Sequence, residues 1–146
     1  METREPTVSI ILPTYNRAHS IGRSIQSVLD QTYPDFELIV IDDGSNDKTE
    51  EVVSGYKDER IRYIQCKINR GAGAARNIGL RLTKGAFIAF QDSDDEWLPE
   101  KLQKQIEVFQ HVDADVGVVY TEMYRISGKN KISRWRTPII KKGRTI

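Results

Sequence analysis

The sequence predicts an α/β fold in which helices cover both faces of a mostly parallel β-sheet. Continuous apolar runs rich in β-branched residues, such as "VSIIL" and "FELIVI", are typical of strands that are buried on both faces. Segments with apolar residues at helical spacing follow these runs, and strands that alternate with helices indicate a parallel sheet. The chain of 146 residues is long enough for one domain with its own hydrophobic core.

Two strand–helix pairs come first along the chain. Residues 8–12 are predicted to form a strand that Pro13 ends, and apolar residues at helical spacing between 21 and 29 indicate a helix with Ser20 as its N-cap. A second buried strand is expected at residues 36–41.

The same alternation continues toward the C-terminus. Asp47 and Glu50 have the spacing of a capping box, so a helix is expected to start near Asp47. The remaining predicted elements are strands at 61–65, 86–90 and 116–123, a helix at 74–82, and a helix entered through Pro99.

The last twenty residues differ from the rest in charge. Residues 127–146 contain no Asp or Glu and show no clear period, whereas residues 1–126 carry the strand–helix pattern. We therefore expect a domain at 1–126, followed at 127–146 by a mobile or partly ordered basic tail or by the start of a further segment.

A charge run of this kind is either solvated or attracted to an anionic membrane surface. Nucleic acid is disfavoured as a partner, because only Trp135 among the aromatic residues lies between the charges. The basic residues of the tail are Lys129, Lys131, Arg134, Arg136, Lys141, Lys142 and Arg144.

The single cysteine and the absence of long apolar runs indicate the compartment. Cys66 has no partner for a disulfide within the chain, which fits a reducing environment. No stretch approaches the roughly 20 apolar residues that a membrane span needs, and the N-terminus lacks a signal-peptide core. We expect a soluble cytoplasmic domain, with the inner face of the membrane as one site of action.

Three polar loops are predicted to meet at one edge of the sheet. "PTYNR", "DDGSND" and "QDSDD" each follow directly on a strand, and the carboxyl ends of parallel strands share one edge. Ligands bind in such sheets beyond these ends, where the strand order reverses. The aspartates expected to share this crevice are Asp42, Asp43, Asp92, Asp94 and Asp95.

The cluster Asp92-Ser93-Asp94-Asp95 predicts a divalent cation. Hard ions such as Mg²⁺ and Mn²⁺ prefer oxygen ligands, often one or two carboxylates together with phosphate oxygens. Helix capping is the alternative explanation and suits Asp95, but a cap needs only one acceptor. An EF-hand is excluded because Trp97 stands where that loop requires glycine. Asp94 is the expected direct ligand.

The other two loops suggest nucleotide binding. Asp42 and Asp43 can accept hydrogen bonds from a base or a ribose, and a strand-to-helix turn needs neither charge. The glycine-rich segment "NRGAGAARN" allows the backbone to approach an anion, although it lacks the Walker and dinucleotide signatures. Arg76 lies in the first turn of the predicted helix, where it serves either a ligand or an acidic group across the crevice. Tyr15 can stack on a base.

The chain resembles the nucleotide-binding half of a family-2 glycosyltransferase of the GT-A fold. The segments that carry the resemblance are "VSIILPTYNR", "ELIVIDDGSNDKT", "NRGAGAARNIGL" and "GAFIAFQDSDDEWLPEKL", which cover nearly everything from Val8 to about Leu102 in the family's order.

The resemblance implies a Rossmann-like GT-A fold and a metal-dependent, inverting sugar transfer. The donor is a nucleotide-diphosphate sugar, with a UDP-sugar favoured, the metal is Mn²⁺ or Mg²⁺, and the acceptor is a saccharide or lipid-linked hydroxyl of cell-wall or polysaccharide biosynthesis. Residues implied to contact the donor are Pro13, Thr14, Tyr15, Asp42 or Asp43, Arg76 and Asp92, and Asp94 is implied to bind the metal, with Asp92 at the ribose or a metal-bound water.

The sequence departs from the family in length. Members usually continue well beyond this point, and their later part carries the acceptor site and the general base, so we expect the fold to be incomplete at the C-terminus. Two other functions stay open: a nucleotide-sugar-binding fragment without turnover of its own, and a doubly wound signalling domain whose aspartates bind Mg²⁺.

Overall fold

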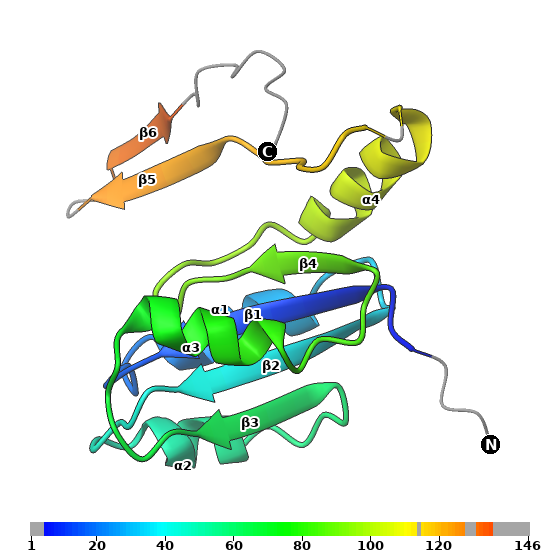
Figure 1. The fold of residues 1–146 in the computed structure, drawn as a ribbon. Coiled ribbons are helices and arrows are strands. Elements are labelled where there is room, and N and C mark those ends of the chain that lie inside the picture. The colour runs from blue at the N-terminus through cyan, green and yellow to red at the C-terminus, as the bar shows by residue number, and fades with distance from the viewer. Residues whose placement is uncertain (1–4, 114, 128–130, 136–146) are drawn as a thin grey trace. The chain divides into compact units, whose positions relative to one another are not determined.

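The computed structural model describes residues 5–113, 115–127 and 131–135 (Figure 1). The chain divides into two compact units, residues 1–103 and residues 104–146. In chain order the elements are β1 (Val8–Thr14), α1 (Ile21–Leu29), β2 (Phe36–Asp42), α2 (Thr49–Ser54), β3 (Ile61–Gln65), α3 (Ala72–Leu80), β4 (Phe87–Phe90), α4 (Lys101–His111), β5 (Met123–Ser127) and β6 (Lys131–Trp135).

The first unit is built on a four-stranded parallel sheet in the order β3-β2-β1-β4. β1 and β2 pair from Val8 opposite Phe36 to Thr14 opposite Asp42, so both strands end at the same level of the sheet. The chain builds β1, β2 and β3 in one direction and then returns to place β4 on the other side of β1. The predicted parallel α/β sheet is therefore confirmed, and the strand order reverses between β1 and β4.

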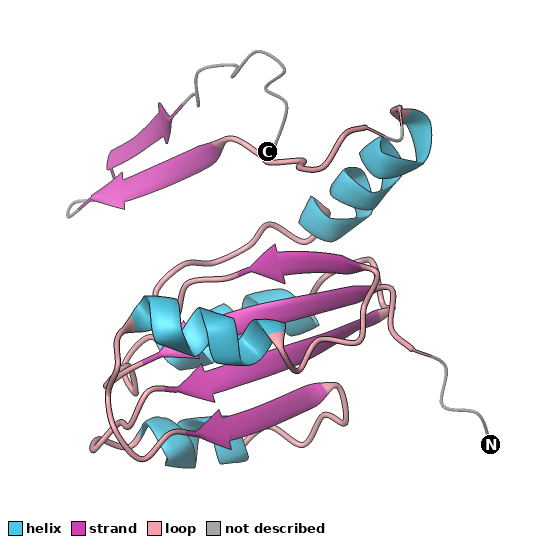
Figure 2. Cartoon of the chain, viewed as in Figure 1, coloured by secondary structure: helices cyan, strands magenta, loops and turns pink. Residues whose placement is uncertain are grey.

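Helices cover both faces of this sheet, as predicted (Figure 2). α3 lies in front of the sheet in this view, and α1 lies behind it. On the α3 side, Ile39 and Ile41 of β2 pack against Ala75. Ile11 of β1 lies directly beneath Gly79, where a Cβ atom would stand 2.5 Å from the Ile11 Cγ2 atom. Burial of both faces explains why β1 and β2 are continuous apolar runs rather than alternating ones.

β1 extends further than predicted, because Pro13 does not end it. Pro13 lies in register opposite Ile41 and the strand continues to Thr14. The Thr14 carbonyl accepts a hydrogen bond from the Asp43 N–H on the β2 side, so the Pro13 backbone faces the β4 side. Pairing with β4 has already ended there, at Ile11 opposite Phe90. A proline without an N–H therefore costs the ladder no hydrogen bond at this position.

The predicted strand at 116–123 is wrong. Residues 116–122 contain no helix or strand, and β5 begins only at Met123. A strand needs a hydrogen-bonding partner as well as an apolar pattern, and the Val118 side chain is 75% exposed. In the second unit β5 instead pairs with β6 as an antiparallel hairpin, which reaches into the segment expected to lack regular structure. The charged side chains of the basic tail lie outside the described residues.

None of the helices in the described part of the chain is long and apolar enough to cross a lipid bilayer.

Candidate functional site

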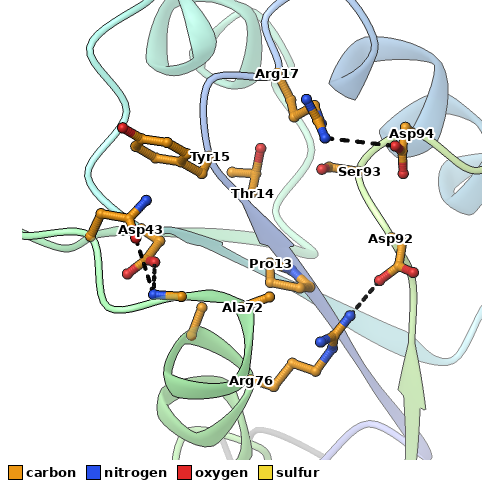
Figure 3. Close-up of a pocket in the computed structure, with 13 residues that line it drawn as sticks. Pro13, Thr14, Tyr15, Arg17, Asp43, Ala72, Arg76, Asp92, Ser93 and Asp94 are labelled. Atoms are coloured by element: carbon orange, nitrogen blue, oxygen red, sulfur yellow. Dashed lines mark hydrogen bonds and ion pairs between the residues drawn. The ribbon is translucent and has the colours of Figure 1, made fainter.

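A pocket of about 400 Å³ opens at the carboxyl ends of β1 and β4 and the N-terminal end of α3 (Figure 3). It therefore lies where the strand order reverses, which is the position expected for a ligand in an open parallel sheet. The residues that line it are Pro13, Thr14, Tyr15, Arg17, Asp43, Asn69, Gly71, Ala72, Ala75, Arg76, Asp92, Ser93 and Asp94.

The end of β1 supplies one wall of the pocket. Thr14 is only 4% exposed, and its hydroxyl oxygen has no hydrogen-bond partner among the described residues. A buried hydroxyl without a partner is costly unless a ligand or a water satisfies it. The next residue, Tyr15, is 43% exposed, so its ring is accessible, and its stacking on a base stays a prediction.

The turn after β1 is fixed to the turn after β2. Asn16 has a φ of 51°, a left-handed conformation that asparagine tolerates better than most residues. Its N–H donates to the Ser45 hydroxyl at 2.8 Å, and its side-chain oxygen accepts from the Asn46 N–H at 2.9 Å. These two bonds fix the turn, which places the Arg17 side chain in the pocket. The sequence did not predict Arg17 as a site residue.

The two aspartates at the end of β2 have different surroundings. Asp42 is completely buried and does not line the pocket; its carboxylate accepts hydrogen bonds from the Ser45 N–H at 2.7 Å and from the Tyr63 hydroxyl. Burial and the bond to Asp42 raise the pKa of Tyr63, which keeps that hydroxyl a donor. Asp43 does line the pocket.

The Asp43 carboxylate also holds the glycine-rich loop. It accepts hydrogen bonds from the backbone N–H groups of Arg70 and Gly71, the shorter of them 2.6 Å. Gly71 has a φ of 88°, which side-chain-bearing residues rarely adopt. The expectation that this region needs neither aspartate charge is therefore wrong, because Asp42 braces the turn after β2 and Asp43 fixes the loop that leads into α3.

The acidic loop, residues 91–99, follows β4 and forms the opposite wall. Asp92 accepts a hydrogen bond from the Arg76 guanidinium at 2.6 Å (Figure 3). The Asp94 carboxylate lies 3.8 Å from the Arg17 guanidinium. Of the two partners expected for Arg76, the structure contains the acidic group across the crevice. Asp95 does not line the pocket. Burial raises the pKa of Asp95, and the neighbouring charges of Asp92 and Asp94 raise it further.

The helix starts near this site differ in detail from the prediction. Ser20 occupies the N-cap position of α1, but its side chain makes no capping hydrogen bond. α2 begins at Thr49, near Asp47 as predicted, and the Asp47 carboxylate accepts from the Thr49 N–H at 3.0 Å and the Ala18 N–H at 3.0 Å. Asp47 therefore links this helix start to the turn after β1.

The donor set suits a hard cation only in combination with a ligand. Among the described residues, no group of three or more His, Cys, Asp or Glu side chains is arranged to hold a metal ion. Asp92 and Asp94 nevertheless supply two carboxylates at the pocket wall, and Mg²⁺ or Mn²⁺ typically takes one or two carboxylates and completes its shell with phosphate oxygens and water. The residues present therefore fit a metal that binds together with a phosphate-bearing ligand.

Most of the predicted site residues meet at this pocket: Pro13, Thr14, Tyr15, Asp43, Arg76, Asp92 and Asp94. Asp42 and Asp95 do not, because the backbone directs their side chains elsewhere. Sequence reasoning missed Arg17 and Asn69, although both stand in loops that it had singled out, at a strand end and beside the glycines.

Comparison with known proteins gives a consistent result. The sequence model described as glycosyl transferase family 2 matches residues 9–145. The chain is 43% identical over 125 residues to UDP-Glc:alpha-D-GlcNAc-diphosphoundecaprenol beta-1,3-glucosyltransferase WfgD of Escherichia coli, which covers 86% of this chain and 48% of that protein. The chain thus spans about half the length of this relative. The match does not favour the alternative of a Mg²⁺-binding signalling domain.

Solved structures agree with this relationship. S. aureus TarS 1-349 in complex with UDP-GlcNAc is 34% identical with a TM-score of 0.68, covering 70% of this chain and 31% of that chain. The mannosyltransferase PcManGT from Pyrobaculum calidifontis, in complex with GDP-Man and Mn²⁺, is 29% identical with a TM-score of 0.70, covering 79% of this chain and 35% of that chain.

Proposed function

Because the chain belongs to glycosyl transferase family 2, we propose that it binds a nucleotide-diphosphate sugar and supports transfer of the sugar to an acceptor hydroxyl. The observation that supports this proposal most is the composition of one pocket. Carboxylates from two strand ends, two arginines, an exposed tyrosine and the start of a helix surround the same 400 Å³. Such a combination suits a ligand with a flat base, a ribose and a charged diphosphate.

In this proposal the β1 and β2 ends hold the nucleoside. Tyr15 stacks on the base, and Pro13 borders it. The unsatisfied Thr14 hydroxyl gains a partner in the ligand, which removes the cost of leaving it buried and unpaired. Asp43, rather than Asp42, accepts a hydrogen bond from the base or ribose, because Asp43 lines the pocket and Asp42 does not.

The diphosphate lies between α3 and the acidic loop. Arg76 and Arg17 each face an aspartate there, so each can turn from its carboxylate to a phosphate oxygen when the ligand enters. The N-terminal end of α3 adds a favourable field for negative charge. Asp94, with Asp92 at the ribose or a metal-bound water, would hold Mn²⁺ or Mg²⁺. The cation would neutralise the charge that develops on the leaving diphosphate.

The transfer itself proceeds with inversion. The acceptor oxygen attacks the anomeric carbon on the face opposite the diphosphate and loses its proton to a general base. The bond between the anomeric carbon and the diphosphate oxygen breaks at the same time, and the nucleoside diphosphate leaves. Arg17 and Arg76 stabilise the negative charge on the leaving group from the two sides of the pocket.

We further propose a UDP-sugar as donor and a saccharide or lipid-linked acceptor, in cell-wall or polysaccharide biosynthesis. The name of WfgD supports both choices, and the UDP-GlcNAc bound in the TarS complex supports the choice of donor. An acceptor attached to a lipid requires the chain to work near a membrane, so we propose action at the cytoplasmic face, with the basic tail in contact with anionic lipid.

Calorimetric titration of UDP and of GDP, each with Mn²⁺ and with a chelator, tests the donor site. We expect Mn²⁺-dependent binding of UDP and weaker binding of GDP. Tight binding of neither nucleotide would refute the proposal, and preference for GDP would refute the choice of donor. Release of free sugar from UDP-glucose without an acceptor then distinguishes an active enzyme from a fragment that only binds the donor.

A further inference from the structure

Three polar side chains in and beside α1 hydrogen-bond to the acidic loop. The Ser20 hydroxyl donates a hydrogen bond to the Ser93 carbonyl at 3.0 Å. About two and three turns further on, the Ser27 hydroxyl accepts from the Trp97 N–H at 3.0 Å, and the Gln31 amide donates to the Leu98 carbonyl at 2.8 Å. Ser27 lies within α1, whereas Ser20 is its N-cap residue and Gln31 follows its C-cap, so the three contacts reach from one end of the helix to the other.

The bond from Ser20 to Ser93 is shielded from water, and the bonds from Ser27 to Trp97 and from Gln31 to Leu98 are partly buried. Ser20 is 3% exposed, Gln31 is 6% exposed and Ser93 is 7% exposed. Gln31 uses both ends of its amide, because its oxygen also accepts from the Leu102 N–H at 3.0 Å. Hydrogen bonds between buried groups are costly to break, since each group left behind has no water to replace its partner.

The hydroxyls of Ser20 and Ser27 bond to the loop and do not serve only α1 itself. The Ser20 hydroxyl stands at the N-cap position and yet bonds to the loop instead of capping α1. The Ser27 hydroxyl donates to the Ser24 carbonyl, which orients its oxygen to accept the loop N–H. The loop's internal bonds, from the Asp95 N–H to the Asp92 carbonyl and from the Gln91 amide to the Asp95 carbonyl, shape it. The Gln91 N–H ties only the loop's first residue to the sheet, through the Ile11 carbonyl at 3.0 Å.

The anchored point lies between the two carboxylates of the proposed metal site. Ser93 separates Asp92 from Asp94, so a fixed Ser93 carbonyl sets the direction of the backbone on both sides. Both carboxylates carry salt bridges to arginines on other elements, with 53% and 58% of their side chains exposed, and pairs this exposed contribute little rigidity. The buried bond from Ser20 to the Ser93 carbonyl, supported by the partly buried bonds from Ser27 and Gln31, is therefore a firmer constraint on the position of the carboxylates than these salt bridges.

We propose that Ser20, Ser27 and Gln31 are positioning residues that hold Asp92 and Asp94 in the geometry needed for metal-dependent nucleotide binding. The inference rests on the proposed function. A site that is preformed binds more tightly because the loop does not have to be ordered on binding, whereas a loosened loop loses affinity for the group that its carboxylates hold. Contacts to the base, which come from the ends of β1 and β2, stay unaffected.

The test compares UDP affinity with Mn²⁺ and with chelator in the full 146-residue chain. For the double variant Ser20→Ala, Ser27→Ala we expect the gain in affinity from Mn²⁺ to fall about fivefold to tenfold, the size expected for loss of one or two hydrogen bonds. Affinity in chelator should stay within about twofold of the wild-type chain. Gln31→Glu is the second variant, since its carboxylate still accepts from the Leu102 N–H but cannot donate to the Leu98 carbonyl.

Ser9→Ala is the matched control. Ser9 is fully buried near the opposite end of β1, and its hydroxyl donates to Glu37 at 2.7 Å. This variant should be destabilised like the others and yet keep the full gain from Mn²⁺. Amide hydrogen exchange should rise at residues 93–98 in the α1 variants and not in the control.

The outcomes separate the inference from the function on which it rests. A Mn²⁺ gain that is unchanged in the α1 variants, or reduced equally in Ser9→Ala, would overturn the positioning role. A wild-type chain whose UDP affinity is the same with Mn²⁺ and with chelator would refute the proposed metal-dependent function and the inference with it.

Discussion

α3 packs tightly against β1 where Gly79 faces Ile11, so Gly79→Ala tests the packing that holds α3, one wall of the pocket, against the sheet. A Cβ atom at Gly79 would stand 2.5 Å from Cγ2 of Ile11 and 3.2 Å from its Cγ1. Ordinary carbon contacts lie at about 3.5–4.0 Å, so the helix and the strand would have to separate by roughly 1 Å. Ile11 is fully buried between its neighbours and has no free space to enter.

The expected cost follows from two opposing effects. Overpacking of this kind costs about 1–3 kcal/mol. Replacing glycine by alanine within a helix raises the free energy of unfolding by about 0.5–1 kcal/mol, and by less at Gly79, which lies next to the end of α3 at Leu80. We therefore expect Gly79→Ala to lower the free energy of unfolding by about 1–2 kcal/mol, which corresponds to a decrease in Tm of about 2–8 °C for a chain of this size.

Thermal and urea unfolding of the variant can be compared with a control in the same helix. A Cβ atom at Gly73 would meet nothing within 4 Å. Gly73→Ala lies in the first turn of α3 and is therefore expected to raise stability by no more than about 0.5 kcal/mol, through helix propensity alone. A Gly79→Ala chain as stable as the wild type, or changed in the same direction as Gly73→Ala, would show that α3 does not lie this close to β1.

Two further predictions concern charged groups. Burial raises the pKa of Glu37, but hydrogen bonds from Ser9, Arg62 and the Lys84 N–H lower it by more, so the net pKa lies below its ordinary value. Its contribution to stability is therefore full at neutral pH and is lost as the pH falls below about 4.5 and through the folded-state pKa. Glu37→Gln should lower the free energy of unfolding by about 1–3 kcal/mol at pH 7, and the gap to the wild type should close in acid unfolding series toward pH 3; a gap that stays constant would argue against this assignment. Asp94→Asn should abolish Mn²⁺-dependent UDP binding in calorimetry with little change in Tm, because its side chain is 58% exposed, and unchanged affinity would remove Asp94 from the metal site.

The sheet and the location of the site could be predicted because both depend on patterns that are local in sequence. Residues 8–14 and 36–42 are apolar throughout, which only a strand buried on both faces explains. Parallel strands then bring the loops after β1, β2 and β4 to one edge, and the pocket lies there.

What escaped prediction depends on contacts between distant segments. Asp42 and Asp43 are neighbours in sequence, yet only the direction of the backbone at the end of β2 decides which of them reaches the pocket. The hydroxyl of Ser20 bonds to a carbonyl 73 residues away, so its N-cap position gave no indication of its partner. The apolar pattern at 116–122 met the composition of a strand but has no partner strand among the described residues.

The most direct test of the whole account is to find where the nucleotide and the metal bind. In amide NMR spectra of the isotope-labelled chain with UDP, added Mn²⁺ broadens signals close to the ion. We expect the amides of Arg17, Ala72, Ser93 and Asp94 to broaden first and those near the other end of the sheet, such as Phe36 and Ile61, to stay sharp. Selective broadening at any other surface, or uniform broadening without UDP-dependent selectivity, would contradict the assignment of this pocket as the donor site.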